Sequence, residues 1–192
     1  FYAMKICYFG IYNPNYSRNE ILMSGLNQIG VEVIQCNADW RDPKRYFKLW
    51  KNLRAMRNEY DCVYAAYPSP IATILARLIS SKPVICDAFY SMFDCVVNDR
   101  GEIPWWHPKA IKLLIIDWLS IMFATAVITD TEAHKQYWAS WWGLNGKKIQ
   151  PALLREAMIL KRGILGGSLD KITKEELRRT VVLMNVFHAQ TL

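Results

Sequence analysis

Several short polar segments of this chain follow apolar runs, and these segments hold the side chains that could do chemistry. Carboxylates, hydroxyls, amides and an arginine alternate there with aromatic rings. Carboxylates accept hydrogen bonds from hydroxyl groups or act as bases, and an arginine near a helix N-terminus favours an anion. The residues that we single out are Tyr12, Arg18, Asn19, Asp87, Ser91, Asp94, Arg100, Thr131 and Glu132.

The first of these segments is GIYNPNYSRN, at residues 10–19. A dinucleotide fingerprint would need G-x-G-x-x-G here, and only Gly10 is present. Arg18 lies close to a predicted helix start, where an anion is favoured. The Asn-Pro-Asn sequence accounts equally well for the segment as a simple turn, so both interpretations stay open.

The segment DAFYSMFDCVVNDRG has polar groups spaced among apolar residues. Its carboxylates could bind hydroxyl groups or act as bases. Asp87 could equally cap a helix, and Asp99 with Arg100 could be a surface pair. The polar candidates in this segment are Asp87, Ser91, Asp94 and Arg100.

The segment VITDTEAHKQYWASWWG, at residues 127–143, contains a third cluster. Thr131 suits a helix N-cap, and Asp130 and Glu132 suit the positive end of the helix dipole. A helix start therefore explains the carboxylates. A helix start does not explain His134, whose side chain could face either a cleft or solvent.

Strand-like and helix-like segments alternate five times along the chain and would position these groups. The apolar runs predict buried strands at 4–10, 31–36, 62–67, 83–89 and 126–130. The intervening patterns predict helices at 17–30, 44–60, 70–81, 108–124 and 131–143, the first with a Ser17–Glu20 capping box and a stop at Gly30. We expect a doubly wound, mostly parallel α/β sheet, with ligands beyond the carboxyl ends of its strands.

The composition is basic and aromatic, with a formal charge of +7 and 8 Trp among 192 residues. This balance favours acidic partners without choosing among them. Since a nucleic-acid role would depend on net charge alone, we predict no nucleic-acid partner. The five cysteines are odd in number and have no C-x-x-C spacing, which predicts buried free thiols in a reducing cytosol. We expect no metal site and no cofactor.

The helix at 44–60 predicts a basic amphipathic surface. Phe47, Trp50, Lys51 and Arg54 are the candidates for facing an anionic membrane. An ordinary crossover helix, with its apolar face on the sheet, is the alternative. The apolar segment 110–128 contains Lys112 and Asp117, so it predicts a buried helix rather than a membrane span.

The ordered set of these segments resembles the N-terminal domain of family 4 glycosyltransferases, which have the GT-B fold. The resemblance is carried by MKICYFGIYNPNYSRNEILMSGLNQIGVEVIQC, by DAFYSMFDCVVNDRG, and above all by AVITDTEAHKQYW followed by GLNGKKI. It implies a Rossmann-like half of a GT-B fold over 4–149, and hexosyl transfer from a nucleotide-sugar without an obligatory metal. It also implies that this half holds a sugar or lipid-linked acceptor.

Carried over residue by residue, the resemblance places an acceptor site on the polar segments. Asp94 is then the catalytic candidate, which would position the acceptor hydroxyl. The remaining acceptor-binding candidates are Tyr12, Arg18, Asn19, Asp87, Ser91, Arg100, Thr131 and Glu132. Such a protein is expected in the cytoplasm, peripheral at the inner face of the membrane.

The chain departs from the family after residue 149. Residues 150–192 predict a helical tail, with helices near 151–161 and 173–188, and are too few for a second doubly wound domain. We therefore expect no donor-binding domain, and no sugar transfer by this chain alone. A non-catalytic binding subunit that pairs with a separate donor-domain chain is the alternative. A nucleotide-dependent oxidoreductase is disfavoured by the missing glycine fingerprint.

Overall fold

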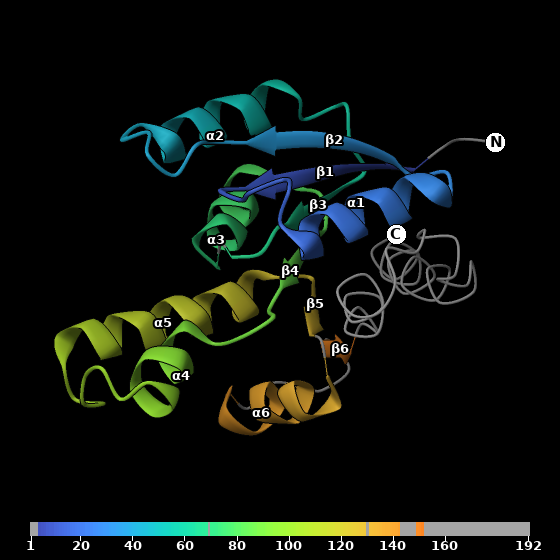
Figure 1. The fold of residues 1–192 in the computed structure, drawn as a ribbon. Helices are drawn as coiled ribbons and strands as arrows, with labels where there is room; N and C mark the ends of the chain where they lie inside the picture. The colour runs from blue at the N-terminus through green and yellow to red at the C-terminus, as the bar shows by residue number, and fades with distance from the viewer. Residues whose placement is uncertain (1–3, 69, 130, 143–148, 152–192) are drawn as a thin grey trace.

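The computed structural model describes residues 4–68, 70–129, 131–142 and 149–151. In this part of the chain, six parallel strands form one sheet in the order β2-β1-β3-β4-β5-β6 (Figure 1). The strands are β1 (Lys5–Gly10), β2 (Glu32–Asn37), β3 (Cys62–Ala65), β4 (Val84–Asp87), β5 (Ala126–Thr129) and β6 (Ile149–Pro151). The predicted parallel α/β fold is confirmed.

Helices cover both faces of the sheet. They are α1 (Ser17–Gln28), α2 (Arg45–Ala55), α3 (Pro70–Ile79), α4 (Met92–Asp94), the π-helix η1 (Cys95–Asp99), α5 (Pro108–Phe123) and α6 (Glu132–Trp142). Figure 1 shows α1 on one side of the strands and the row α2, α3, α5 on the other. Right-handed crossovers require this arrangement. The step from β1 to β2 runs toward one edge of the sheet, whereas every later step runs toward the other edge, so α1 lies on the opposite face from α2, α3 and α5.

The alternation of side chains along β1 divides the core into two layers. Ile6 and Tyr8 are fully buried on the α1 side, where the Tyr8 ring stacks on Tyr64 at 5.0 Å. Cys7 and Phe9 point to the other side and pack among residues of α2 and α3. Because both faces of the strand are buried, β1 is apolar at consecutive positions, as the sequence indicates.

The ends of several elements differ from the sequence-based expectation. Tyr16 is the N-cap of α1 and has no capping side-chain bond, so the predicted Ser17–Glu20 capping box is wrong. Gly30 does end the α1 segment, and its φ of 85° explains why glycine stands there. Pro151 lies in β6, so no helix begins at 151. The rest of the predicted helical tail, 152–192, lies outside the described residues.

The cysteines of the described chain are all free, as predicted. Cys7, Cys36, Cys62 and Cys86 are buried, and Cys95 is half-buried. Burial raises the pKa of the Cys62 and Cys86 thiols to about 12. These thiols act as small core residues and are protonated at neutral pH.

Candidate functional site

A groove of about 710 Å³ lies beyond the carboxyl ends of β1, β2 and β3. This is the point where the sheet order reverses, since β2 lies on one side of β1 and β3 on the other. Open α/β sheets hold their ligands in such crevices. The lining residues whose side chains could contact a ligand are Asn13, Tyr16, Asn37, Asp39, Trp40 and Tyr67.

The walls of the groove combine aromatic rings with short polar side chains. Trp40 has 68% of its surface exposed and Tyr16 is also exposed, so both rings are open to a ligand. None of the described lining residues of this groove is Lys or Arg. The groove therefore suits a neutral, hydroxyl-bearing ligand better than a phosphate.

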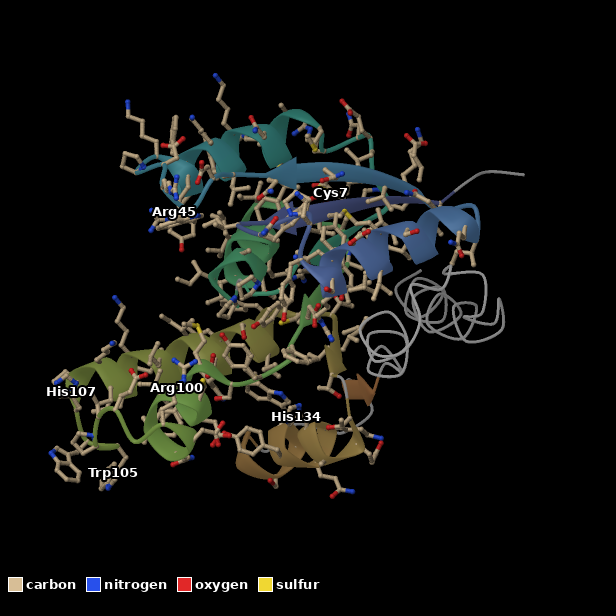
Figure 2. The ribbon with its side chains drawn as sticks, viewed as in Figure 1. Cys7, Arg45, Arg100, Trp105, His107 and His134 are labelled. Atoms are coloured by element: carbon tan, nitrogen blue, oxygen red, sulfur yellow. The ribbon has the colours of Figure 1, made fainter. Side chains whose placement is uncertain are left out.

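A second hollow of about 320 Å³ extends the groove toward α3 and α4. The two spaces share Ile11, Trp40 and Pro68 as lining residues, and the second reaches Met92. Arg45, at the start of α2, lines this second part; Figure 2 shows it beside the carboxyl edge of the sheet. The combined groove thus runs along this edge from β2 toward β4.

Reciprocal hydrogen bonds hold the floor of the groove. The Asn37 side chain donates to the Tyr12 carbonyl at 2.8 Å and accepts from the Tyr12 amide at 3.2 Å. The Tyr12 hydroxyl points into the core, where it donates to Gln35 at 3.2 Å. Tyr12 therefore lines the groove but offers it little besides its edge and backbone.

A buried ion pair lies behind the groove. Arg18 binds Asp87 through two hydrogen bonds, Nε to Oδ2 at 2.8 Å and Nη2 to Oδ1 at 2.5 Å, and neither side chain is exposed. Burial alone lowers the pKa of Arg18, but the Asp87 carboxylate more than offsets it and the net pKa is raised. Tyr64 also donates to Asp87 at 3.0 Å, and the Arg18 cation lies over the Phe89 ring at 4.6 Å.

These contacts tie the groove loop to the centre of the sheet. Asn19 follows Arg18 on α1, and its Oδ1 accepts from the Tyr8 hydroxyl at 2.9 Å. Its Nδ2 donates to the carbonyl of Asn13, at 3.0 Å, in the loop that forms one wall. Burial, followed by the nearby Asp87 charge, raises the pKa of the Tyr8 and Tyr64 hydroxyls. Arg18 and Asp87 thus position the site rather than contact a ligand.

A second polar network connects α4 to α5. The buried Asp117 carboxylate accepts from the Ser91 hydroxyl at 2.7 Å and from the Phe93 amide at 2.9 Å. Burial raises the pKa of Asp117 to about 6. Ser91 also caps α4 by accepting from the Asp94 amide at 3.0 Å. Ser91 is therefore occupied with local structure, and Asp117, which sequence reasoning treated as a buried helix residue, holds it in place.

The structure separates the predicted site residues into two groups. Tyr12 and Asn19 line the large groove, and Arg18 lies directly behind it. Asp94 is half-buried on α4 and accepts from Asn98 at 2.6 Å, outside the lining of either hollow. Their part in acceptor binding or catalysis stays a prediction.

The remaining predicted site residues lie on exposed loops or at a helix start. Arg100 is exposed and pairs with Glu102 at 3.3 Å. Thr131 accepts from the His134 amide at 3.1 Å, so it is the helix cap of α6, and Glu132 pairs with Lys135. Asp130 lies outside the described residues. A role for Arg100, Thr131 or Glu132 in binding an acceptor would need a ligand that extends well beyond the groove.

Sequence reasoning missed the residues that open most directly into the groove. Asp39 and Trp40 follow β2, where CNADW has the same apolar-to-polar change as the other strand ends. The Asp39 carboxylate accepts from the Arg41 amide at 2.8 Å, which fixes the turn that presents Trp40. That local turn signal could have been read from the sequence.

The four residues predicted to face a membrane are all exposed on α2. Leu49 and Leu53 supply the buried side of this helix instead. Phe47 and Trp50 stack on each other at 5.8 Å, and the Arg54 guanidinium lies over Trp50 at 5.5 Å. Leu49 and Leu53 pack on the sheet, whereas Phe47 and Trp50 are exposed on the other side of α2. Membrane contact by α2 stays a prediction.

No metal-binding group of three or more His, Cys, Asp or Glu side chains occurs among the residues that the structure describes. In the same part of the chain, no helix has the length and apolar character needed to cross a bilayer.

The strand order and the position of the groove define a Rossmann-like α/β domain. A solved structure with a similar fold is UDP-N-acetylglucosamine 2-epimerase from Rickettsia bellii, with a TM-score of 0.50 and 16% identity. The match covers 86% of this chain and 51% of that protein, so the chain spans about half of the epimerase. Neither the scan against protein-family models nor the search of curated proteins finds a match.

At this identity the likeness establishes the fold alone. It agrees with the Rossmann-like half that the sequence predicts. Membership of glycosyltransferase family 4 remains a prediction.

Proposed function

We propose that this chain is the acceptor-side domain of a nucleotide-sugar-dependent glycosyltransferase, and that the groove at the end of β1, β2 and β3 holds the acceptor sugar. The single observation that carries the proposal is the exposed Trp40 ring, which stands among Asn and Asp side chains at the reversal point of the sheet. The likeness to half of an enzyme named for UDP-N-acetylglucosamine supports it.

The groove offers the contacts that a sugar ring needs. A sugar ring has an apolar C–H face and a rim of hydroxyls. An aromatic ring can stack on the C–H face, and short polar side chains beside it can hydrogen-bond to the hydroxyls. Trp40 supplies the aromatic ring, with the Arg41 guanidinium held 5.0 Å above it. Asp39 and Asn13, which are both exposed, supply polar groups at the rim. Arg18 and Asp87 would keep the loops at their spacing before the ligand arrives, which reduces the ordering cost of binding.

The second hollow gives the acceptor a direction. It continues from Trp40 past Pro68 to Met92, which comes just before Phe93 and Asp94 on the chain. An acceptor that follows this course would bring its far end toward Asp94. In this proposal Asp94 positions the acceptor hydroxyl, and Ser91 holds α4 through its bonds to Asp117 and to the Asp94 amide.

The proposal predicts that the 192-residue chain binds an acceptor but does not transfer sugar by itself, because the donor side would be supplied by another domain. Purified chain incubated with UDP-N-acetylglucosamine and sugar acceptors should show no turnover. Multiple turnovers by the purified chain would refute this part. Co-purification with a separate donor-domain chain would instead identify it as a binding subunit.

Binding by the groove is tested by saturation-transfer NMR with a panel of free monosaccharides and short oligosaccharides. Trp40→Ala should abolish the transfer signal of any sugar that binds, because it removes the stacking ring. Trp105→Ala is the matched control, since both tryptophans are 68% exposed and Trp105 lies just before the start of α5, outside the lining of the groove. An equal loss in both variants, or an unchanged signal in Trp40→Ala, would exclude the groove as the sugar site.

A further inference from the structure

The outer face of α5 carries an exposed apolar stripe. Ile111, Ile115, Trp118 and Met122 are spaced by four, three and four residues, which places them on one side of the helix. Each has between 40% and 49% of its surface exposed. The opposite side of α5 is already buried through Ala110, Leu113 and Ile121. A helix that is apolar on both sides normally has a second surface to cover it.

Two adjacent exposed tryptophans come just before α5. Trp105 and Trp106 are 68% and 64% exposed, and their rings touch edge to face at 6.0 Å. Figure 2 shows Trp105 and His107 at the tip where α5 begins, which projects away from the sheet. Exposed tryptophans at such a tip suit the interface between water and a bilayer, because the ring has both an apolar face and a polar N–H group.

The neighbouring helices of the same layer add basic charge. α3 packs between α2 and α5, and Figure 1 shows the three helices in one row. Residues 44–57, 70–82 and 105–123 together hold ten Lys and Arg residues and one acidic residue, Asp117, which is buried. On α2, the stacked pair Phe47 and Trp50 lies beside the exposed Lys51 and Arg54.

We infer that the outer surface of α2, α3 and α5 docks this domain on an anionic bilayer, with Trp105, Trp106 and the α5 stripe in the interface and the α2 cations over the headgroups. The apolar stripe would be covered equally well by a bilayer or by a second copy of this chain, and the charge of the surface distinguishes the two. A second copy of the chain would bring two cationic faces together, whereas an anionic surface attracts them. With 16 residues, α5 is shorter than the roughly 20 apolar residues that a membrane span needs, so it would lie in the interface.

This surface is independent of the proposed sugar groove. The groove is lined by residues of the loops that follow β1, β2 and β3, and of α2 and α3 its extension reaches only the first residues. The residues proposed to contact the bilayer, Trp105, Trp106, Lys51 and Arg54, line neither space. Vesicle binding can therefore be measured with no sugar and no acceptor present, and its failure would leave the groove proposal untouched.

The test is sedimentation of the full chain with phosphatidylcholine vesicles, with and without phosphatidylglycerol, at low ionic strength. We expect binding only to the phosphatidylglycerol vesicles, and release by added salt. Trp105→Ala combined with Trp106→Ala should weaken binding by at least about tenfold, since interfacial binding scales with buried apolar area. Both side chains are exposed, so the fold should be unaffected.

The electrostatic part is tested with two variants of equal net charge. Lys51→Gln with Arg54→Gln removes two charges from α2 and should weaken binding by roughly twenty-fivefold, at about fivefold per basic side chain. Asn27→Glu with Gln28→Glu changes the net charge equally on exposed positions of α1, across the sheet, and should bind almost as wild type. The inference would be overturned if the α1 variant lost as much binding as the α2 variant, or if wild type bound the uncharged vesicles equally well or bound no vesicles at all. It would also be overturned by a dimer in solution that the tryptophan variant dissociates.

Discussion

The Arg18–Asp87 ion pair allows a quantitative test of what holds the groove together. We predict that Arg18→Met destabilises the protein severely. Methionine keeps much of the side-chain volume and removes the cation. Asp87 would then lie with no side-chain surface exposed and with Tyr64 as its remaining side-chain donor, at 3.0 Å. Removing one partner of a buried ion pair costs about 3–5 kcal/mol, mostly because the other charge is left unpaired.

The size of this loss follows from the geometry of the pair. Both oxygens of Asp87 accept from Arg18, so two charge-assisted bonds are lost at once. A domain of this size has a free energy of unfolding of about 5–15 kcal/mol, so the variant would lose a large share of it. Arg18→Met combined with Asp87→Leu should recover part of the loss, since no charge then stays buried alone.

Urea unfolding followed by far-UV circular dichroism measures these changes. Arg100→Met is the matched control, because Arg100 makes a similar ion pair with Glu102 on the surface, and it should unfold as wild type. A loss below about 1 kcal/mol in Arg18→Met would refute the account, since it would mean that Asp87 is not held by Arg18. A double variant that loses as much as the sum of the single variants would contradict the coupling between the two side chains.

Three further predictions concern the stability of the fold. Leu53→Ala, at a fully buried position of α2, should lower the free energy of unfolding by about 2–5 kcal/mol in the same urea assay; a loss below about 1 kcal/mol would mean that α2 is not packed on the sheet as described. Gly30→Ala should cost about 1 kcal/mol, because φ is 85° there while no atom lies within 4 Å of an added Cβ; no change would contradict the left-handed turn. Burial raises the pKa of Asp117 to about 6 from its ordinary value of 3.8, so the folded state binds this proton more tightly than the unfolded state and stability falls as pH rises from about 4 to 7. Asp117→Asn should remove about 3 kcal/mol of that pH-dependent loss, and parallel pH profiles of variant and wild type would refute the assignment.

The order and type of the main elements could be predicted from the sequence. Fully apolar runs such as that of β1 predict buried parallel strands, and the structure contains them. Helix and strand ends were harder to predict. The capping box at Ser17 was wrong because Tyr16 takes the N-cap position, and α4 and η1 are short turns with no periodic pattern to read.

The site could be predicted only in part, for a physical reason. Strand ends can be found from sequence, but which of them share a groove depends on strand order. The order places β1 between β2 and β3, so the end of β2 contributes Asp39 and Trp40 to the groove, while Asp94 lies on α4 after β4. The pairing of Arg18 with Asp87, 69 residues apart, also depends on tertiary structure. Sequence reasoning identified both side chains but could not pair them with each other.

The most direct test of the central claim is ¹H–¹⁵N correlation NMR of the chain during titration with the sugars that give a saturation-transfer signal. The account predicts that the backbone resonances of Asn13, Asn19, Asp39, Trp40 and Tyr67 shift together, with one dissociation constant, and that Trp40→Ala removes the shifts. Shifts that gather on another surface, or no sugar that shifts these resonances at any concentration, would contradict the claim that this groove holds a sugar.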